Sequence, residues 1–284
     1  GCEADLAIEL VRFVILRSKL LFLLSFLPGL KQIGEHKIRR RHAMKKSRRY
    51  PKHDGRKRSS AVDLSHKNVM NSQNFITNAK LIHRIIGFAG FQPEDTVLEI
   101  GTGKGHLTEA LCRSAGTVCS VEIDHRLYES AGRRLSQFSN LKLIHGDFLK
   151  YDLPVKGTYR VFANIPYFIT TQIIEKLTQA PNTPAEMWLV MEKGAAKRFL
   201  GIPKETRKSL LLKVSWDMKI VYHFHREDFH PMPAVDSVLV HFAKRAAPDL
   251  TKSEYHAFQK FIEQSMKYGI CGKGALLTKR QVSV

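Results

Sequence analysis

The chain has 284 residues, 43% of them apolar and 25% charged, which suits one large α/β domain and a small second one. A formal net charge of +20 at pH 7 indicates a polyanionic partner, with nucleic acid favoured over a membrane surface. The four cysteines show no paired or Cys/His spacing. We therefore expect neither a zinc site nor a disulfide framework, and we expect a reducing, cytoplasmic setting.

Residues 1–43 differ in composition from the rest of the chain. The chain begins with Gly1, and the apolar run from Leu20 to Leu27 is shorter than the roughly 20 residues of a membrane span. A long basic run follows it, whereas a signal peptide carries its charges first. We expect Met44 to be the native start and residues 1–43 to be a non-native upstream extension. A membrane anchor is the alternative, and we expect no membrane partner.

Residues 44–70 are predicted to form a basic, disordered arm. Between Lys31 and Arg58 there are 13 Lys and Arg residues against 2 acids, and the run KKSRRYPKHDGRKRSS has almost no apolar content. The segment is either a solvated tail or an arm that lies along phosphates and gains affinity by counterion release. The high net charge of the whole chain favours the arm.

From Asn71 the chain alternates between predicted helices and strands. The apolar side chains of Leu81, Ile82, Ile85 and Ile86 recur at helical spacing, and several short β-branched runs end in glycine or polar residues. The expected helices are at 78–89, 106–115, 125–138, 171–179, 193–200, 208–218 and 253–269. The expected strands are at 95–101, 117–124, 141–147, 159–167, 185–192, 219–225 and 236–245.

This order predicts an α/β fold with a doubly wound parallel sheet and an antiparallel piece late in the chain. The strands at 219–225 and 236–245 are joined by a Pro-rich loop and are expected to form that hairpin. We expect a catalytic domain at 71–246 and a helical C-terminal domain at 247–284. Trp188 and Trp216 are predicted core residues.

Four successive strands end in small or polar residues, which are Gly101, Glu122, Asp147 and Asn164. Ligands in open α/β sheets bind outside the carboxyl ends of strands, so this ordered set indicates a nucleoside cofactor. Glu122 lies 21 residues after Gly101, a spacing that suits a bond to ribose hydroxyls. The loop EIGTGKG alone would also suit a nicotinamide cofactor or a plain tight turn, and it lacks the GKS or GKT of a P-loop.

Seven motifs occur in order: NSQNFIT, EIGTGKG, VEID, HGDFL, NIPYFIT, MEKGAAKRF and FHPMPAVDS. With them the chain resembles, from about Asn71 to Arg245, the Erm rRNA adenine N6-methyltransferases, which confer resistance to macrolides, lincosamides and streptogramin B. The housekeeping small-subunit rRNA dimethyladenosine transferases share QNF, the glycine loop and an NIPY-type motif. MEKGAAKRF and FHPMPAVDS are more similar to Erm.

The resemblance implies a Rossmann-like class I methyltransferase with a small C-terminal helical domain, acting as a monomer on one adenine of 23S large-subunit rRNA. It implies S-adenosylmethionine as cofactor, with contacts at Asn74, Ile76, Gly101, Glu122, Asp147 and Asn164. Glu122 would hold the ribose hydroxyls and Asp147 the adenine amine. Because the chain stops at Val284, we expect the C-terminal domain to be truncated.

The resemblance also implies a site for the target base at NIPY. The Asn164 side-chain oxygen and the Ile165 carbonyl would accept hydrogen bonds from the adenine amine. Pro166 would stiffen the loop, because its φ is fixed and it has no N–H. Tyr167 would stack on the flipped base, and Phe229 is a candidate for a second flat contact. No general base or metal is required.

Basic side chains beside the cleft are candidates for RNA binding, or else belong to solvated helix faces: Lys193, Lys197, Arg198, Arg133 and Arg134. His223, His225 and His230 show no convincing metal spacing. Two other functions stay open. One is housekeeping dimethylation of small-subunit rRNA, and the other is a catalytically inactive RNA-binding assembly factor.

Overall fold

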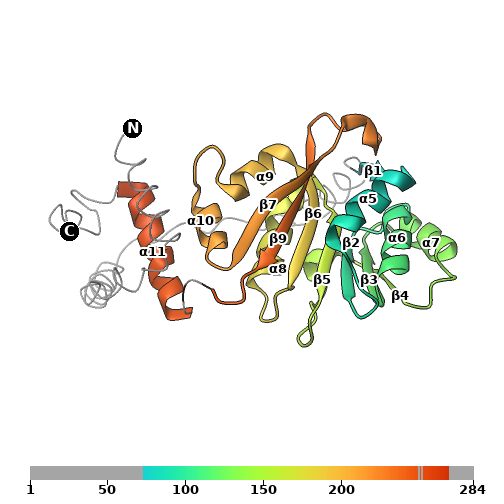
Figure 1. Ribbon diagram of the computed structural model, residues 1–284, viewed down its shortest axis with the longest axis horizontal. Helices are drawn as coiled ribbons and strands as arrows, with labels where there is room; N and C mark the ends of the chain where they lie inside the picture. Colours follow the sequence, from blue (N-terminus) through green and yellow to red (C-terminus); the bar gives the residue numbers. More distant parts are fainter. Residues whose placement is uncertain (1–72, 249, 251, 269–284) are drawn as a thin grey trace, which may run out of the picture. The chain divides into compact units, whose positions relative to one another are not determined.

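The computed structural model describes residues 73–248, 250 and 252–268 (Figure 1). The expected upstream extension and basic arm lie outside the described residues, as does the end of the chain after residue 268. Among the described residues, 73–247 belong to one compact unit and the later residues to another. No helix in these described parts is long and apolar enough to cross a membrane.

A seven-stranded mixed sheet forms the centre of the larger unit, with the order β4-β3-β2-β5-β6-β9-β7. Its strands are β2 (Thr96–Ile100), β3 (Thr117–Glu122), β4 (Leu141–His145), β5 (Arg160–Asn164), β6 (Glu186–Glu192), β7 (Trp216–His223) and β9 (Ser237–Lys244). The first five are parallel, and β9 runs antiparallel to both β6 and β7. This confirms the predicted fold class and the late hairpin. Strand order reverses between β2 and β5, which creates a topological switch point.

Helices cover both faces of the sheet. The apolar faces of α5 (Ala79–Ala89) and α6 (His106–Ser114) pack on one face, and those of α8 (Thr170–Gln179) and α9 (Lys193–Leu200) on the other. Successive residues of β2 point to opposite faces of the sheet. Val97 therefore packs in the cluster under α5 and α6, and Leu98 in the cluster under α8 and α9. The other helices are α7 (His125–Arg134), α10 (Arg207–Lys213) and α11 (Lys252–Tyr268).

The sequence explains where α5 begins and ends. Asn78 is the N-cap, and its side-chain oxygen accepts hydrogen bonds from the backbone N–H groups of Lys80 and Leu81. Gly90 ends the helix in the left-handed conformation at φ 56°. This helix leads the chain from the segment at residues 73–78 to β2, so its two caps help to fix where that segment lies.

The helix predicted at 208–218 is wrong in its second half. Helix α10 ends at Lys213, and β7 already begins at Trp216. The leucines at 210–212 continue a helical pattern. From Trp216 onwards exposure alternates, with Trp216 buried, Asp217 exposed and Met218 half-buried, and this is the period of a strand. Pairing of Trp216 with Lys244 extends the hairpin over those residues. Trp188 and Trp216 are both core residues, as expected.

A second sheet of two short strands was not predicted. Strand β1 (Phe75–Ile76) pairs antiparallel with β8 (Phe229–His230). This pairing joins the motif NSQNFIT to the motif FHPMPAVDS, which lie more than 150 residues apart in the chain. The segment at residues 73–76 is thereby held across the carboxyl ends of the central strands, where it lines a pocket.

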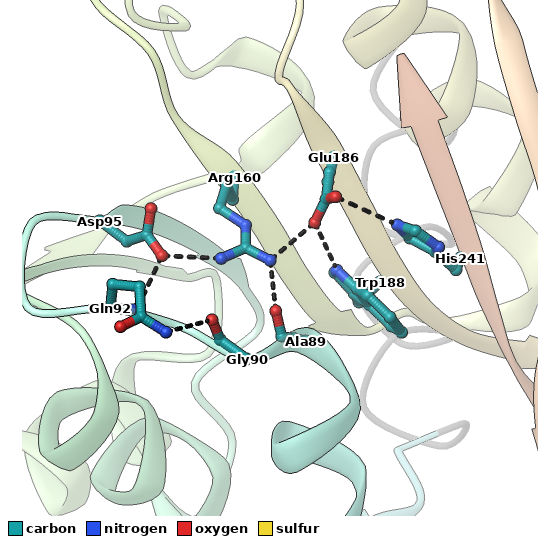
Figure 2. A network of polar contacts seen from close by, with 8 residues as sticks. All are labelled: Ala89, Gly90, Gln92, Asp95, Arg160, Glu186, Trp188 and His241. Atoms are coloured by element: carbon teal, nitrogen blue, oxygen red, sulfur yellow. Dashed lines mark hydrogen bonds and ion pairs between the residues drawn. The ribbon is translucent and has the colours of Figure 1, made fainter. Parts of the chain in front are cut away.

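A polar network lies at the amino ends of the parallel strands, opposite the pocket (Figure 2). Arg160, the first residue of β5, forms ion pairs with Asp95 at 2.7 Å and with Glu186, the first residue of β6, at 2.6 Å. Glu186 also accepts a hydrogen bond from the Trp188 indole, which stacks on His241 with ring centroids 3.9 Å apart. The network ties β5, β6 and β9 together at the amino ends of the parallel strands. It leaves the carboxyl ends of those strands for a ligand.

Candidate active site

A pocket opens at the carboxyl ends of β2 and β5, where the strand order reverses. Four segments line it: residues 73–76, the glycine loop and the start of α6 (101–104 and 106–107), residues 122–123 at the end of β3, and the turn at 164–167. The pocket therefore brings together most of the predicted site residues, which are Asn74, Ile76, Gly101, Glu122, Asn164, Ile165, Pro166 and Tyr167.

The glycine loop is shaped by backbone conformations that side chains rarely adopt. Gly101 has φ 80° and Gly103 has φ 54°. A Cβ atom on Gly103 would lie 2.8 Å from the Phe75 ring, so the loop and β1 approach each other too closely for any side chain there. Helix α6 begins directly after the loop. The backbone N–H groups of its first turn lie at the pocket.

Glu122 connects the end of β3 to the glycine loop. It is 2% exposed, its Oε2 accepts from the backbone N–H of Gly103 at 2.8 Å, and its Oε1 accepts from that of Asp124 at 2.8 Å. Burial raises the pKa of this carboxyl, and the hydrogen bonds from Asp124 and Gly103 act in the opposite direction. Each carboxylate oxygen has a second lone pair, so Glu122 can also accept hydrogen bonds from ligand hydroxyls.

The turn after β5 is fixed by bonds to distant segments. The Asn164 side-chain nitrogen donates to the Asn74 carbonyl at 2.6 Å, so the side-chain oxygen is the atom available to accept from a ligand. The Tyr167 hydroxyl bonds to the Ser237 hydroxyl at 2.6 Å. Burial raises the pKa of Tyr167, so the phenol stays neutral and serves as a hydrogen-bonding anchor for its ring.

Two predicted site residues, Asp147 and Phe229, are not among the residues that line the pocket. One oxygen of Asp147 accepts from the Leu149 N–H at 2.9 Å and caps the short helix η1 (Phe148–Lys150). Phe229 is 1% exposed and packs 5.2 Å from Phe224 between ring centroids. Pairing of β8 with β1 turns this ring into the core, so it offers no face to a base, and this expectation is corrected.

The predicted RNA-binding cations differ in how far they are engaged within the protein. Lys197 and Arg198 are exposed on α9, whereas Lys193 lies 3.8 Å from Asp236. In α7, Arg133 pairs with Glu129 at 3.3 Å on an exposed helix face. The RNA role of all these residues stays a prediction.

Arg134 lies differently from the other predicted cations. Its guanidinium pairs with Glu109 at 3.0 Å and donates to the Lys104 carbonyl at 3.4 Å. It therefore holds the glycine loop against α6 and α7. This is a contact that the spacing of basic residues in the sequence did not indicate.

Sequence reasoning missed several residues at the pocket. Phe75, Thr102 and Lys104 line it, and the Lys104 ammonium lies 5.1 Å from the centre of the Phe75 ring. Phe75 stands inside the motif NSQNFIT, so the motif held the signal, but only pairing with β8 places the ring against the glycine loop. In the described parts of the chain, no group of three or more His, Cys, Asp or Glu side chains could hold a metal ion.

The mixed sheet, the glycine loop, Glu122 at the end of β3 and the NIPY turn define a Rossmann-like methyltransferase. The family described as ribosomal RNA adenine dimethylase matches residues 64–270, and the chain belongs to this family. This membership makes the protein an rRNA adenine methyltransferase, and the methyl donor implied for the family is S-adenosylmethionine.

Two curated relatives carry the description rRNA adenine N-6-methyltransferase. The protein from Bacillus licheniformis is 39% identical over 196 residues, which are 69% of this chain and 68% of that protein. The protein from Escherichia coli is 34% identical over 198 residues, which are 70% of this chain and 79% of that protein.

Two solved structures are similar to this chain in both fold and sequence. The 23S rRNA methyltransferase ErmE is similar with a TM-score of 0.64 and 30% identity, covering 68% of this chain and 79% of its own. A dimethyladenosine transferase from Plasmodium falciparum is similar with a TM-score of 0.62 and 29% identity, covering 68% of this chain and 71% of its own.

Proposed function

We propose that this enzyme methylates the N6 amine of a specific adenine in 23S rRNA of the large ribosomal subunit. It thereby confers resistance to macrolides, lincosamides and streptogramin B. The observation that carries the proposal is one pocket in which Glu122 and the glycine loop face the NIPY turn. The motif FHPMPAVDS, which favours the Erm enzymes, contributes Ser237, the anchor of Tyr167.

The residues on one side of the pocket fit a nucleoside cofactor. S-adenosylmethionine, when bound, supplies a methyl group activated by a sulfonium. Glu122 would accept hydrogen bonds from its ribose hydroxyls, and the missing Cβ of Gly101 lets the backbone approach it closely. Asn74 and Ile76 would border it. Asp147, which lies outside the pocket lining, would accept from its adenine amine through its second oxygen.

The NIPY turn would hold the target base. The exocyclic nitrogen of adenine is a poor nucleophile because its lone pair is delocalised into the ring. The Asn164 side-chain oxygen and the Ile165 carbonyl would accept its two N–H groups, orient it and favour a pyramidal nitrogen. Pro166, at φ −61°, keeps the turn rigid, and Tyr167 would stack on the flipped base. The amine proton then passes to solvent.

The decisive experiment is primer extension on rRNA from cells that express the protein or its Tyr167→Ala variant. We expect a stop at one large-subunit adenine with the wild type and none with the variant. Expressing cells should also survive a macrolide. Unmodified large-subunit rRNA in cells that make soluble wild-type protein would contradict the proposal.

Housekeeping dimethylation of small-subunit rRNA is the second candidate. The observation in its favour is the similarity to the Plasmodium falciparum dimethyladenosine transferase, whose TM-score of 0.62 is close to the 0.64 of ErmE. Labelling each isolated ribosomal subunit with a radioactive methyl donor separates the two candidates. Preference for the small subunit would reverse our ranking, and absence of cofactor binding in calorimetry would favour an inactive assembly factor.

A further inference from the structure

Phe168 is an aromatic side chain that the proposed reaction does not use. It follows Tyr167 in the single turn η2 (Tyr167–Ile169), and 41% of its surface is exposed. The neighbouring Ile165 is 1% exposed, so this turn buries one apolar side chain and presents another to solvent. Phe168 is not among the residues that line the pocket, so its ring lies next to the lining residue Tyr167, where it can contact a part of the substrate that stays outside the pocket.

The backbone that carries Phe168 is held on both sides. The Ile169 N–H donates to the Pro166 carbonyl at 3.2 Å, and the Thr170 hydroxyl donates to the Tyr167 carbonyl at 3.0 Å. The Tyr167 side chain is itself anchored on Ser237 at 2.6 Å. Phe168 therefore has a fixed place relative to the Tyr167 ring, and little ordering of the backbone is needed when a ligand binds it.

Charged side chains of both signs lie near this turn. Asp236, next to the anchor Ser237, pairs with Arg226 at 2.9 Å and lies 3.8 Å from Lys193. Two cations thus share one carboxylate, and the charge of a second acid, Glu192, also acts on Tyr167. Because the family acts on ribosomal RNA, the occupant of this surface is an RNA strand, whose phosphates can pair with Lys193 and Arg226.

We propose that Phe168 stacks on the nucleotide next to the flipped target adenine. When one base leaves its stack, its neighbour loses a stacking partner, and an aromatic side chain can replace that partner. Tyr167 would then receive the target base and Phe168 the adjoining one, so two consecutive residues read two consecutive nucleotides. This inference rests on the proposed function, because it takes an RNA strand as the substrate of the same pocket.

The test uses the full chain and a short single-stranded oligoribonucleotide with one adenine. The fluorescent base 2-aminopurine is placed on the 5′ or the 3′ side of that adenine in two versions. The variants are Phe168→Ala, Phe168→Trp and the matched control Phe88→Ala, whose ring is 44% exposed on α5. Kd for the oligonucleotide, quenching of 2-aminopurine, and KM and kcat with large-subunit rRNA are measured.

We expect the wild type to quench 2-aminopurine in one of the two versions. Phe168→Ala should lose that quenching and bind about tenfold more weakly, within the range for loss of one base–aromatic stack. KM for rRNA should rise about tenfold with kcat little changed, and affinity for S-adenosylmethionine should stay the same. Phe168→Trp should retain quenching, and Phe88→Ala should behave as the wild type does.

Quenching and Kd of Phe168→Ala equal to those of the wild type would overturn the stacking proposal while large-subunit methylation stands. Equal losses in Phe168→Ala and Phe88→Ala would also overturn it, because any exposed ring would then suffice. If the wild type quenches 2-aminopurine in the oligonucleotide but methylates neither large-subunit nor small-subunit rRNA, only the proposed function is refuted. A wild type that does not bind the oligonucleotide would overturn the stacking proposal whatever its activity.

Discussion

Glu99 is a fully buried acid directly beneath the glycine loop. Its Oε2 accepts hydrogen bonds from the hydroxyls of Thr108 at 2.7 Å and Ser120 at 2.6 Å, and Ser120 bonds in turn to Thr102 in the loop. Burial raises the pKa of Glu99 from 4.5 to about 8, despite the opposing hydrogen bonds from Ser120 and Thr108. Glu99 is therefore mainly protonated at neutral pH and links β2, β3, α6 and the loop as a neutral group.

The protonated state of Glu99 predicts a pH dependence of stability. Its pKa is raised on folding, so its contribution is complete below pH 4.5 and is lost as pH rises towards 8. In Glu99→Gln this loss is absent. The difference in free energy of unfolding between variant and wild type should therefore grow by about 1.4 kcal/mol per pH unit across that window.

Urea unfolding at pH 5, 6, 7 and 8 measures this difference. Glu94→Gln, at an exposed glutamate before β2, is the matched control and should follow the wild type at every pH. Parallel curves for Glu99→Gln and the wild type would mean that Glu99 is ionised in the folded protein throughout.

Two proposed roles of Tyr167, stacking of its ring on the base and anchoring of the ring through its hydroxyl, can be tested separately. Tyr167→Ala removes the ring and should lower kcat by at least about a hundredfold, with little change in affinity for S-adenosylmethionine. Ser237→Ala removes the bond between the two hydroxyls, and Tyr167→Phe removes this bond together with the contact of the hydroxyl with Asn74. Both should lower kcat less than Tyr167→Ala does, with the larger loss in Tyr167→Phe. Single-turnover kinetics and calorimetry measure the two quantities. Equal losses of rate and cofactor affinity in Tyr167→Ala would mean that the ring is structural.

At the residue scale, the sequence predicted the side chains that end the parallel strands. Glu122 and Asn164 line the pocket because the carboxyl ends of parallel strands share one edge, which follows from the order of the elements alone. Phe229 was wrong because its orientation depends on a strand pairing that its local sequence does not reveal. Glu99 was missed as a buried group, since an acid in an apolar strand has no pattern of its own.

At the element scale, the glycine loop and β1 depend on one another for space. In Gly103→Ala, a methyl group would meet the Phe75 ring at 2.8 Å and the residue would be held at φ 54°. We expect affinity for S-adenosylmethionine to fall at least about tenfold, because the loop must move away from the pocket. Calorimetric titration measures it.

Gly157→Ala is the matched control for this substitution. Gly157 has φ 81° but nothing within 4 Å of its missing Cβ, so the variant carries backbone strain without a clash. It should lose stability and keep cofactor affinity. If Gly157→Ala binds the cofactor as weakly as Gly103→Ala does, the contact with Phe75 is not what shapes the loop.

Strands and helices with a clear period were predictable, and the short or mixed segments were not. β1 and β8 have two residues each, too few to show a period, and their pairing is set by the tertiary fold. The segment at 208–218 contains a helix and a strand in direct succession, with Val214 and Ser215 between them. Its leucine run supports a helix locally, so only packing against β9 reveals where the strand begins.

At the scale of the whole molecule, the net charge of +20 governs how the enzyme meets RNA. Residues 44–58 carry 8 of the 46 Lys and Arg residues. Their removal should weaken RNA binding and flatten the plot of log K against log salt by about 0.7 to 0.9 for each phosphate that the shortened protein no longer neutralises. Filter binding at several salt concentrations measures the slope.

A scrambled version of residues 44–58 keeps the charge and serves as the control. It should retain the slope of the intact chain, because counterion release depends on charge and not on order. An unchanged slope after removal of the segment would show that these residues do not lie on phosphate.

The stacked pair Trp188 and His241 in the polar network also makes the protein an optical reporter of its own sheet. Both tryptophans of the chain, Trp188 and Trp216, are at most 5% exposed, and neither lines the pocket. Their emission should shift only when the sheet opens to water, and stay constant while cofactor or RNA enters at the opposite edge. Tryptophan emission can therefore follow unfolding while 2-aminopurine in the oligonucleotide follows binding in the same sample, without an added label on the protein.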